Sequence, residues 1–188
     1  VAYIKKGDFN NGFKAANEIA KKQPKNPLGY NLMGAASLGL NKRDDARKYF
    51  QQALKIEPKF STAEMNLAAL AEQENRLSDA QAHYRAVLKQ DSKHVGAMLA
   101  LARISEKSGD DKQAGEWLVQ AWNKNPGLVS GTTLTRYYLS RNQGLKALKI
   151  AREVQASSEG DPRALHLLGS AQLLAGEKAS AVMTFRQL

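Results

Sequence analysis

The sequence lacks the residues on which several classes of site depend. None of its 188 residues is cysteine, so the chain has neither disulfide bonds nor a thiolate metal site. His83, His94 and His166 have no second histidine or carboxylate at a metal-binding spacing, and no Gly-Lys-Ser/Thr motif marks a phosphate loop. No apolar run reaches the roughly eighteen residues needed to cross a membrane. We therefore expect no metal, no cofactor, no transmembrane segment and no enzymatic activity in this chain.

The net charge of +10 is concentrated in the first 60 residues. Clustered lysine and arginine side chains attract anionic partners such as nucleic acid. Here, however, residues such as Lys21, Lys22, Lys42 and Arg43 fall in predicted turns and on predicted outer faces. We interpret most of the excess as a solvated surface and keep RNA as an alternative partner.

The sequence repeats itself at a fixed interval. The segment that begins with Pro27, Leu28, Gly29 and Tyr30 has a counterpart that begins at Pro162. Further copies start at positions 61, 95 and 128, so successive starts lie 34, 34, 33 and 34 residues apart. A constant period of this size is the signature of stacked structural repeats.

Each unit contains two predicted helices, because apolar residues recur at helical spacing in both of its halves. Between the halves stands a glycine or asparagine, which tolerates the left-handed backbone that ends a helix. In the six copies this residue is Gly7, Asn41, Asn75, Gly109, Asn142 and Gly176. Five positions later every copy has glycine or alanine, so the two helices must approach closely. Helix N-termini are predicted at Asn26 and Asp161, each followed by proline, and at capping boxes beginning at Ser61 and Ser78.

The unit that spans residues 27–60 resembles the tetratricopeptide repeat. It carries that family's pattern at Tyr30, Met33, Gly34, Ala46, Phe50, Ala53 and Pro58. The resemblance covers the whole chain and implies an all-α fold, a right-handed α-solenoid (superhelix) of antiparallel helix pairs, A and B. We expect a single array over 1–188, comprising a partial repeat at 1–26, full repeats at 27–60, 61–94, 95–127 and 128–161, and a repeat at 162–188 truncated in helix B.

Both ends of the chain interrupt a unit. Val1 falls inside a helix A, and Leu188 falls inside a helix B. We expect the chain to be a fragment of a longer protein. Its exposed repeat ends would then either self-associate or be covered by neighbouring repeats.

The repeat at 128–161 departs most from the family pattern. It has Gly131 at an aromatic position, Thr135 at the glycine position and Ala151 at the second aromatic position. Together with the missing residue just before it, these changes predict the least well packed joint of the array. We expect altered curvature or higher mobility around residues 124–136.

The family resemblance implies where a partner would bind. In tetratricopeptide arrays helix A lines the concave side, and the second, fifth, ninth, twelfth and thirteenth residues of each unit face the groove. From these positions we take as candidate groove residues Met65, Ala69, Glu72, Gln73, Leu99, Arg103, Glu106, Lys107, Thr132, Arg136, Leu139, His166, Ser170 and Leu173. The mixture of apolar and charged residues favours an extended peptide or a partner helix.

Arg103 and Arg136 hold the same place on consecutive A helices. Their guanidinium groups could together grip a carboxylate, or they could pair with Glu72 and Glu106 across the groove. Polysaccharide binding is a further alternative, although most aromatic residues fall on the inward-facing stripe. Only Trp117 and Tyr137 are ambiguous in this respect.

A narrower resemblance rests on residues 115–121, 138–142 and 167–176. These runs are similar to the PrsT-like repeat lipoproteins of bacterial PEP-CTERM/exosortase systems. That family is associated with exopolysaccharide production and surface-protein sorting, and is anchored through an N-terminal lipidated cysteine that this segment does not contain. The resemblance implies a periplasmic or outer-membrane-anchored location. Without it, a cytoplasmic location is expected.

Overall fold

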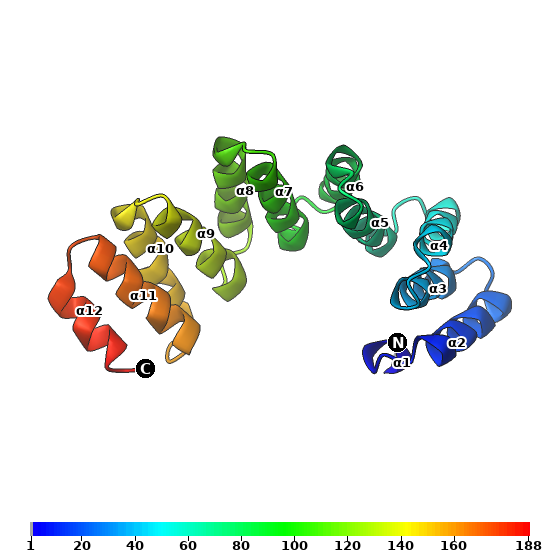
Figure 1. The fold of residues 1–188 in the computed structure, drawn as a ribbon, viewed down its shortest axis with the longest axis horizontal. Helices are drawn as coiled ribbons and strands as arrows, with labels where there is room; N and C mark the ends of the chain where they lie inside the picture. Colours follow the sequence, from blue (N-terminus) through cyan, green and yellow to red (C-terminus); the bar gives the residue numbers. More distant parts are fainter. Residues whose placement is uncertain (1) are drawn as a thin grey trace. The chain divides into compact units, whose positions relative to one another are not determined.

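The computed structural model describes residues 2–188, and over that range every regular element is an α-helix (Figure 1). The predicted all-α fold is therefore confirmed. Val1, which the sequence places inside a helix A, lies outside the described residues. The chain divides into two compact units, residues 1–92 and residues 93–188.

The first unit contains six helices within its described residues. They are α1 (Ala2–Lys5), α2 (Phe9–Lys22), α3 (Pro27–Gly39), α4 (Arg43–Ile56), α5 (Ser61–Gln73) and α6 (Leu77–Gln90). Helix α3 packs against both α2 and α4, and α5 packs against both α4 and α6.

The second unit also contains six helices. They are α7 (Val95–Lys107), α8 (Asp111–Lys124), α9 (Leu128–Ser140), α10 (Gly144–Ser157), α11 (Pro162–Leu174) and α12 (Lys178–Phe185). Helix α9 packs against α8, α10 and α11, so it has neighbours on three sides. The A helices of the four full repeats begin at residues 27, 61, 95 and 128, and that of the truncated repeat begins at 162, where the sequence period starts.

The turn between helices A and B has the backbone conformation that the sequence predicts. Asn41, Asn75 and Asn142 have φ between 55° and 59°, and glycine adopts a positive φ at the corresponding positions 7, 109 and 176. Asparagine and glycine are the residues that enter this left-handed region at least cost. One position with positive φ, Gly160, lies outside the predicted series, in the loop before α11.

Helix capping agrees with the sequence at two of four predicted sites. The side chains of Asn26 and Asp161 accept hydrogen bonds from the second backbone N–H of the helix that follows, with proline in the first turn. The capping boxes at Ser61 and Ser78 are wrong. Ser61 is already inside α5 and donates its hydroxyl to Gln90, while α6 begins one residue before Ser78.

The helices of one repeat approach closely at a small residue, as predicted. The alanine five positions after the turn is fully buried in all five later copies. These residues are Ala46, Ala80, Ala114, Ala147 and Ala181. A larger side chain at this point would force the two helices apart.

A second close approach is governed by complementary side-chain sizes. A Cβ atom on Gly34 would lie 2.5 Å from the Phe50 ring, and one on Gly169 would lie 2.6 Å from the Phe185 ring. In the repeat at 128–161 the same pair of positions holds a larger residue, Thr135, opposite a smaller one, Ala151. Both of these residues are buried. Threonine and alanine together are smaller than glycine and phenylalanine, so this pair fills less volume, and the Thr135 hydroxyl has no hydrogen-bond partner among the described residues.

The expectation of loose packing around Gly131 is also wrong. A Cβ atom on Gly131 would lie 2.1 Å from Cγ2 of Val154 and 2.6 Å from Cζ3 of Trp122. Trp122 stands where earlier repeats have Leu54 and Leu88, so its larger ring occupies the space left by the missing aromatic side chain. It belongs to one core cluster with Leu118, Leu134, Ile150 and Val154. Trp122 of the preceding helix, α8, therefore fills the space beside Gly131.

We therefore predict that Gly131→Ala destabilises the protein by about 1–3 kcal/mol, because the added methyl overpacks a filled site. Urea denaturation monitored by circular dichroism measures this effect. Gly127→Ser is the matched control, since Gly127 has extended backbone and a Cβ atom there would have no neighbour within 4 Å, and serine is a favourable N-cap. Equal stability of the two variants would contradict the packing argument.

An ionic network joins successive repeats in the first unit. Glu74, in the turn after α5, accepts hydrogen bonds from Arg76 and from Arg47 of α4. Arg47 also bonds Asp44, and Arg76 bonds Asp79. The hydrogen bond from Arg76, followed by that from Arg47, lowers the pKa of Glu74. The carboxylate is therefore stabilised in the folded chain.

This lowered pKa predicts the direction of a pH effect. In the unfolded chain Glu74 takes up a proton near its usual pKa of 4.5, whereas in the folded chain it stays ionised to lower pH. Its contribution to stability is complete above that pH and is lost as the pH falls through the folded pKa. We expect the melting temperature of Glu74→Gln to fall less than that of the unmodified chain between neutral and acidic pH. If acid lowers the melting temperatures of the two proteins by the same amount, Glu74 makes no such contribution.

Candidate functional site

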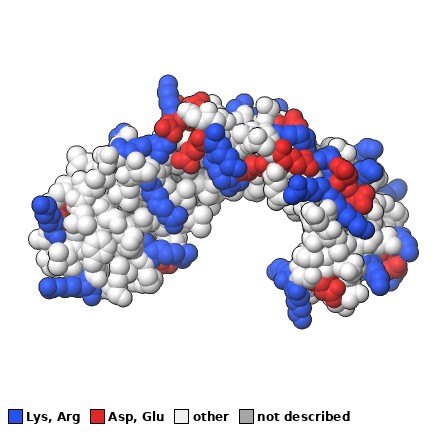
Figure 2. Space-filling view, viewed as in Figure 1, with Lys and Arg blue, Asp and Glu red and all other residues white. Residues whose placement is uncertain are grey.

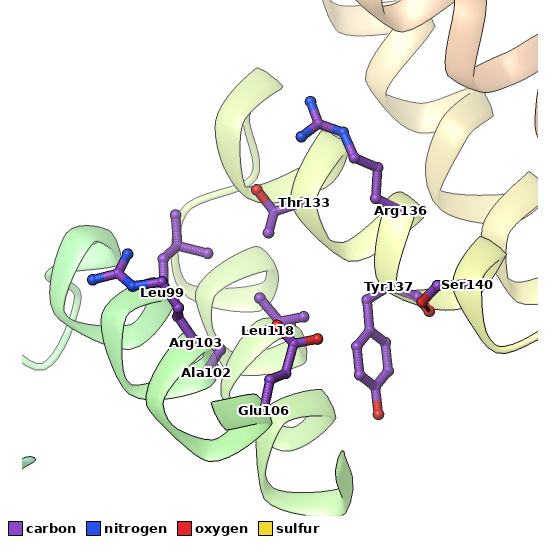
Figure 3. A pocket seen from close by; sticks show the side chains of 9 residues that line it. All are labelled: Leu99, Ala102, Arg103, Glu106, Leu118, Thr133, Arg136, Tyr137 and Ser140. Atoms are coloured by element: carbon purple, nitrogen blue, oxygen red, sulfur yellow. Dashed lines mark hydrogen bonds between the residues drawn. The ribbon is translucent and has the colours of Figure 1, made fainter. Parts of the chain in front are cut away.

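A pocket of about 450 Å³ opens between α7 and α9, within the second unit (Figure 3). It is lined by Leu99, Ala102, Arg103, Glu106, Leu118, Thr133, Arg136, Tyr137 and Ser140. Both α7 and α9 are A helices, so the pocket lies on the side of the unit where the sequence predicts a binding groove.

The floor of the pocket is apolar. Ala102 and Leu118 are buried members of the main core cluster of this unit, and Leu99 packs against the same cluster. The cavity therefore ends on a rigid, well-packed surface. Its composition suits an aliphatic side chain of a ligand, whose burial would contribute about 25 cal/mol per Å² of apolar area.

Tyr137 forms one wall and is fixed on several sides. Its hydroxyl donates a 2.7 Å hydrogen bond to the backbone carbonyl of Asp111, at the start of α8. The Arg141 guanidinium lies 4.0 Å from the centre of the Tyr137 ring and also bonds the Asp111 carboxylate. A Cβ atom on Gly115 would lie 2.5 Å from the Tyr137 hydroxyl oxygen, so only glycine at that position leaves room for the ring. These contacts hold the start of α8 against α9.

The rim of the pocket has an uneven charge. The carboxylate of Glu106 lies 3.6 Å from the Arg141 guanidinium, which partly neutralises it. Arg136 is exposed and has no ion-pair partner among residues 93–188. Figure 3 shows the Arg103 and Arg136 guanidinium groups apart and pointing in different directions. The two arginines border one cavity from opposite helices without meeting each other.

Four of the predicted groove residues line this pocket, namely Leu99, Arg103, Glu106 and Arg136. Thr132 does not, because it is 6% exposed and its hydroxyl bonds the carbonyl of Val129. Leu139 packs against a neighbouring core cluster, and Glu72 accepts a hydrogen bond from Tyr84. The remaining candidates lie on the A helices with exposed or half-buried side chains: Met65, Ala69, Gln73, Lys107, His166, Ser170 and Leu173.

Thr133 and Tyr137 line the pocket but were not predicted as groove residues. Ser140, which also lines it, was not among the candidates although it is the thirteenth residue of its unit. The fixed-position rule selects the middle of the exposed face on every A helix. A cavity between two A helices is instead lined by the edge of each exposed face that is turned toward the other helix. On α9 this edge is displaced by about one residue, or roughly 100° of helix rotation. The signal in the sequence was Tyr137, an aromatic residue where the other repeats have the aliphatic residues Ala36, Leu70, Ile104 and Ala171.

Among residues 2–188, histidine and carboxylate side chains do not gather into a metal centre. The described residues contain no group of three or more that could hold a metal ion. None of the helices over residues 2–188 combines the length and the apolar character that a membrane crossing requires. The site is thus defined by shape, apolar surface and arginine side chains.

Comparison with known proteins agrees with this geometry. Residues 27–60 match one family model described as tetratricopeptide repeat, and residues 71–128 match a second model with the same description. Residues 27–60 and 71–128 are therefore tetratricopeptide repeats. Proteins of this family are generally non-catalytic scaffolds for protein–protein interaction. No curated protein matches the chain in sequence.

Solved tetratricopeptide-repeat structures share the fold at low sequence identity. The C-terminal part of a TPR repeat-containing protein from Cytophaga hutchinsonii has a TM-score of 0.78 and 14% identity, covering 98% of this chain and 74% of that one. PilW, a type IV pilus biogenesis factor, has a TM-score of 0.71 and 22% identity, covering 100% and 87%. YrrB, described as a TPR protein with an unusual peptide-binding site, has a TM-score of 0.64 and 14% identity, covering 92% and 90%. At these identities the likeness establishes the fold alone.

The role of Tyr137 in this tetratricopeptide unit can be measured. Tyr137→Phe removes the hydrogen bond to the Asp111 carbonyl, and we expect a loss of about 0.5–1.5 kcal/mol in the free energy of unfolding. Tyr138→Phe is the neighbouring control, because no hydrogen bond from the Tyr138 hydroxyl to a described residue is present. Urea denaturation should give a lower free energy of unfolding for Tyr137→Phe than for Tyr138→Phe. A Tyr137→Phe variant as stable as Tyr138→Phe would show that this hydrogen bond contributes nothing to stability.

Proposed function

We propose that this protein is a non-catalytic scaffold that binds an extended peptide or a helix of a partner protein on the face formed by its A helices. The observation that carries the proposal is the pocket between α7 and α9. It combines a buried apolar floor with two arginines on its rim, which is the composition of a site that takes one side chain and orients its neighbours.

The rim favours a ligand with a carboxylate. Glu106 is partly neutralised by Arg141, whereas Arg136 has no ion-pair partner in its own unit. An acidic group beside an aliphatic one would satisfy the rim and the floor together. Guanidinium–carboxylate hydrogen bonds are among the strongest that side chains form. The description of YrrB as a peptide-binding TPR protein adds support by analogy.

Binding to RNA or polysaccharide is less well supported. On the face drawn in Figure 2, basic and acidic side chains are interspersed and form no continuous basic stripe. Among the aromatic residues, Phe50, Tyr84 and Trp122 are buried in the core and cannot stack on a sugar or a base. Strong salt dependence of binding, which follows from phosphate neutralisation, would favour RNA instead.

The similarity to PrsT-like lipoproteins suggests a biological setting. We propose that the scaffold acts within a bacterial exopolysaccharide or surface-protein sorting system, on the periplasmic side of a membrane. The support for this setting is the sequence similarity over residues 115–121, 138–142 and 167–176. Recovery of a partner protein from such a system by crosslinking in cells would test it.

The peptide site can be tested with peptides selected from a random displayed library. We expect selected peptides to contain an acidic residue beside an aliphatic one. The double variant Arg103→Ala/Arg136→Ala should bind them at least about tenfold more weakly, because two charge-assisted contacts are lost. Leu99→Glu should abolish binding by placing a charge against the apolar floor. Isothermal titration calorimetry measures both effects.

The matched control is the double variant Lys124→Ala/Arg186→Ala. It removes the same net charge from exposed positions that do not line the pocket. If both double variants weaken binding equally, attraction is due to overall charge and the proposed site is wrong. Unchanged binding to Arg103→Ala/Arg136→Ala would rule out the arginine rim, and unchanged binding to Leu99→Glu would rule out the pocket itself.

A further inference from the structure

A second concave surface lies between the B helices α8 and α10, with α9 beneath it. It consists of two hollows of about 490 and 390 Å³. Val119, Tyr138 and Lys146 line both hollows, so these three residues form the centre of one continuous trough. None of the three lines the pocket between α7 and α9.

The trough results from residues that are particular to this repeat. At the position of Tyr138 the other full repeats have Ser37, Ala71 and Ser105, which are all buried. A tyrosine cannot fit in so small a space, and its half-buried ring extends between α8 and α10. Burial, with the neighbouring Tyr137, raises the pKa of Tyr138 above its ordinary value of 10.0.

The wall on α8 is also unusual. Val119 stands where the other repeats have polar residues, Gln51, Arg85, Arg152 and Arg186. The trough therefore has an aliphatic wall where every other B helix has a polar side chain. Trp122 and Ile150, both buried, extend the apolar surface at one end.

The lining residues form straight lines along both helices. On α8 they are Lys112, Gly115, Glu116, Val119, Gln120, Trp122 and Asn123, and on α10 they are Lys146, Lys149, Ile150 and Glu153. Intervals of three and four residues keep side chains on one face of a helix. The span on α8 corresponds to about 16 Å, or three helical turns. A straight trough of this length between two helices matches the shape of a third helix.

The trough carries one more positive than negative charge. Lys112 and Glu116 line one hollow, Lys149 and Glu153 line the other, and Lys146 at the centre lines both. The Lys146 ammonium is 5.6 Å from the centre of the Tyr138 ring, which places a positive charge beside the apolar centre. None of the lining lysines or glutamates forms an ion pair with any residue in the range 93–188 that the structure describes. Their charges are available to a partner.

We propose that this trough is a second docking surface, which takes an amphipathic helix of a partner protein. The apolar face of that helix packs on Val119 and Tyr138, and an aspartate or glutamate on its flank pairs with Lys146. This surface shares only the Tyr137 wall with the peptide site on the A helices, so the protein holds two partners, or two segments of one partner, at once.

Two synthetic helical peptides of about 15 residues can serve as probes. Both carry leucine at every third or fourth position on one face, and the flanking positions are glutamate in one and lysine in the other. We expect the acidic probe to bind more tightly in fluorescence anisotropy. Lys146→Glu should weaken the acidic probe by about tenfold or more and strengthen the basic probe. Val119→Arg, which introduces the residue found in equivalent places, should abolish binding of both.

Controls separate this surface from the peptide site. Lys178→Glu reverses an exposed charge on α12 and should leave both probes unaffected, as should Leu99→Glu in the other pocket. The proposal is overturned if the acidic probe fails to bind the unmodified chain, or if Lys146→Glu weakens both probes equally. It is also overturned if a proline-containing acidic peptide that cannot form a helix binds as tightly as the helical one, or if Leu99→Glu removes probe binding. Circular dichroism of every variant establishes that the fold is retained.

Discussion

The whole structure depends on how closely the two helices of one repeat can approach. That distance is set by a fully buried alanine after the turn in the five later copies. It is also set by two facing positions, one on each helix, whose side chains compete for the same space. Where helix A has Gly34 or Gly169, helix B has a phenylalanine. Where helix A has Thr135, helix B has only Ala151. The sizes at the two positions therefore vary in opposite directions, so each residue has to be judged together with its partner on the other helix.

This constraint explains which features the sequence could predict. The period, the helix starts and the left-handed turn residues follow from local chemistry, and all of them are visible in the repeated letters. Loose packing was wrongly expected at Gly131 because the missing aromatic residue was considered without its packing partners on other helices. Its compensation, Trp122, lies on the preceding helix and would be found only by comparing both partners of the contact. The capping boxes failed for a related reason, since the side chains of Ser61 and Glu64 bond other helices instead of their own N-terminus.

The pocket was predictable in part. Repeat positions identified Leu99, Arg103, Glu106 and Arg136, because a residue on an exposed A face recurs at a fixed place in every unit. They did not identify Tyr137 or Thr133, because a cavity between two helices depends on how far the helices stand apart. That separation is set by Tyr137 resting on Gly115 and on the Asp111 carbonyl, which is a tertiary contact with no periodic signature.

Tyr137 lines both the pocket on the A helices and one hollow of the trough on the B helices. Coupling between two sites requires a shared element that has two arrangements, each favoured by one of the ligands. The Tyr137 ring is held by a hydrogen bond, by the Arg141 guanidinium and by close contact with Gly115, so it has little freedom to adopt a second position. The shared wall therefore acts as a partition. Ligands on its two sides should bind independently, and a scaffold built in this way joins two segments without making either one depend on the other.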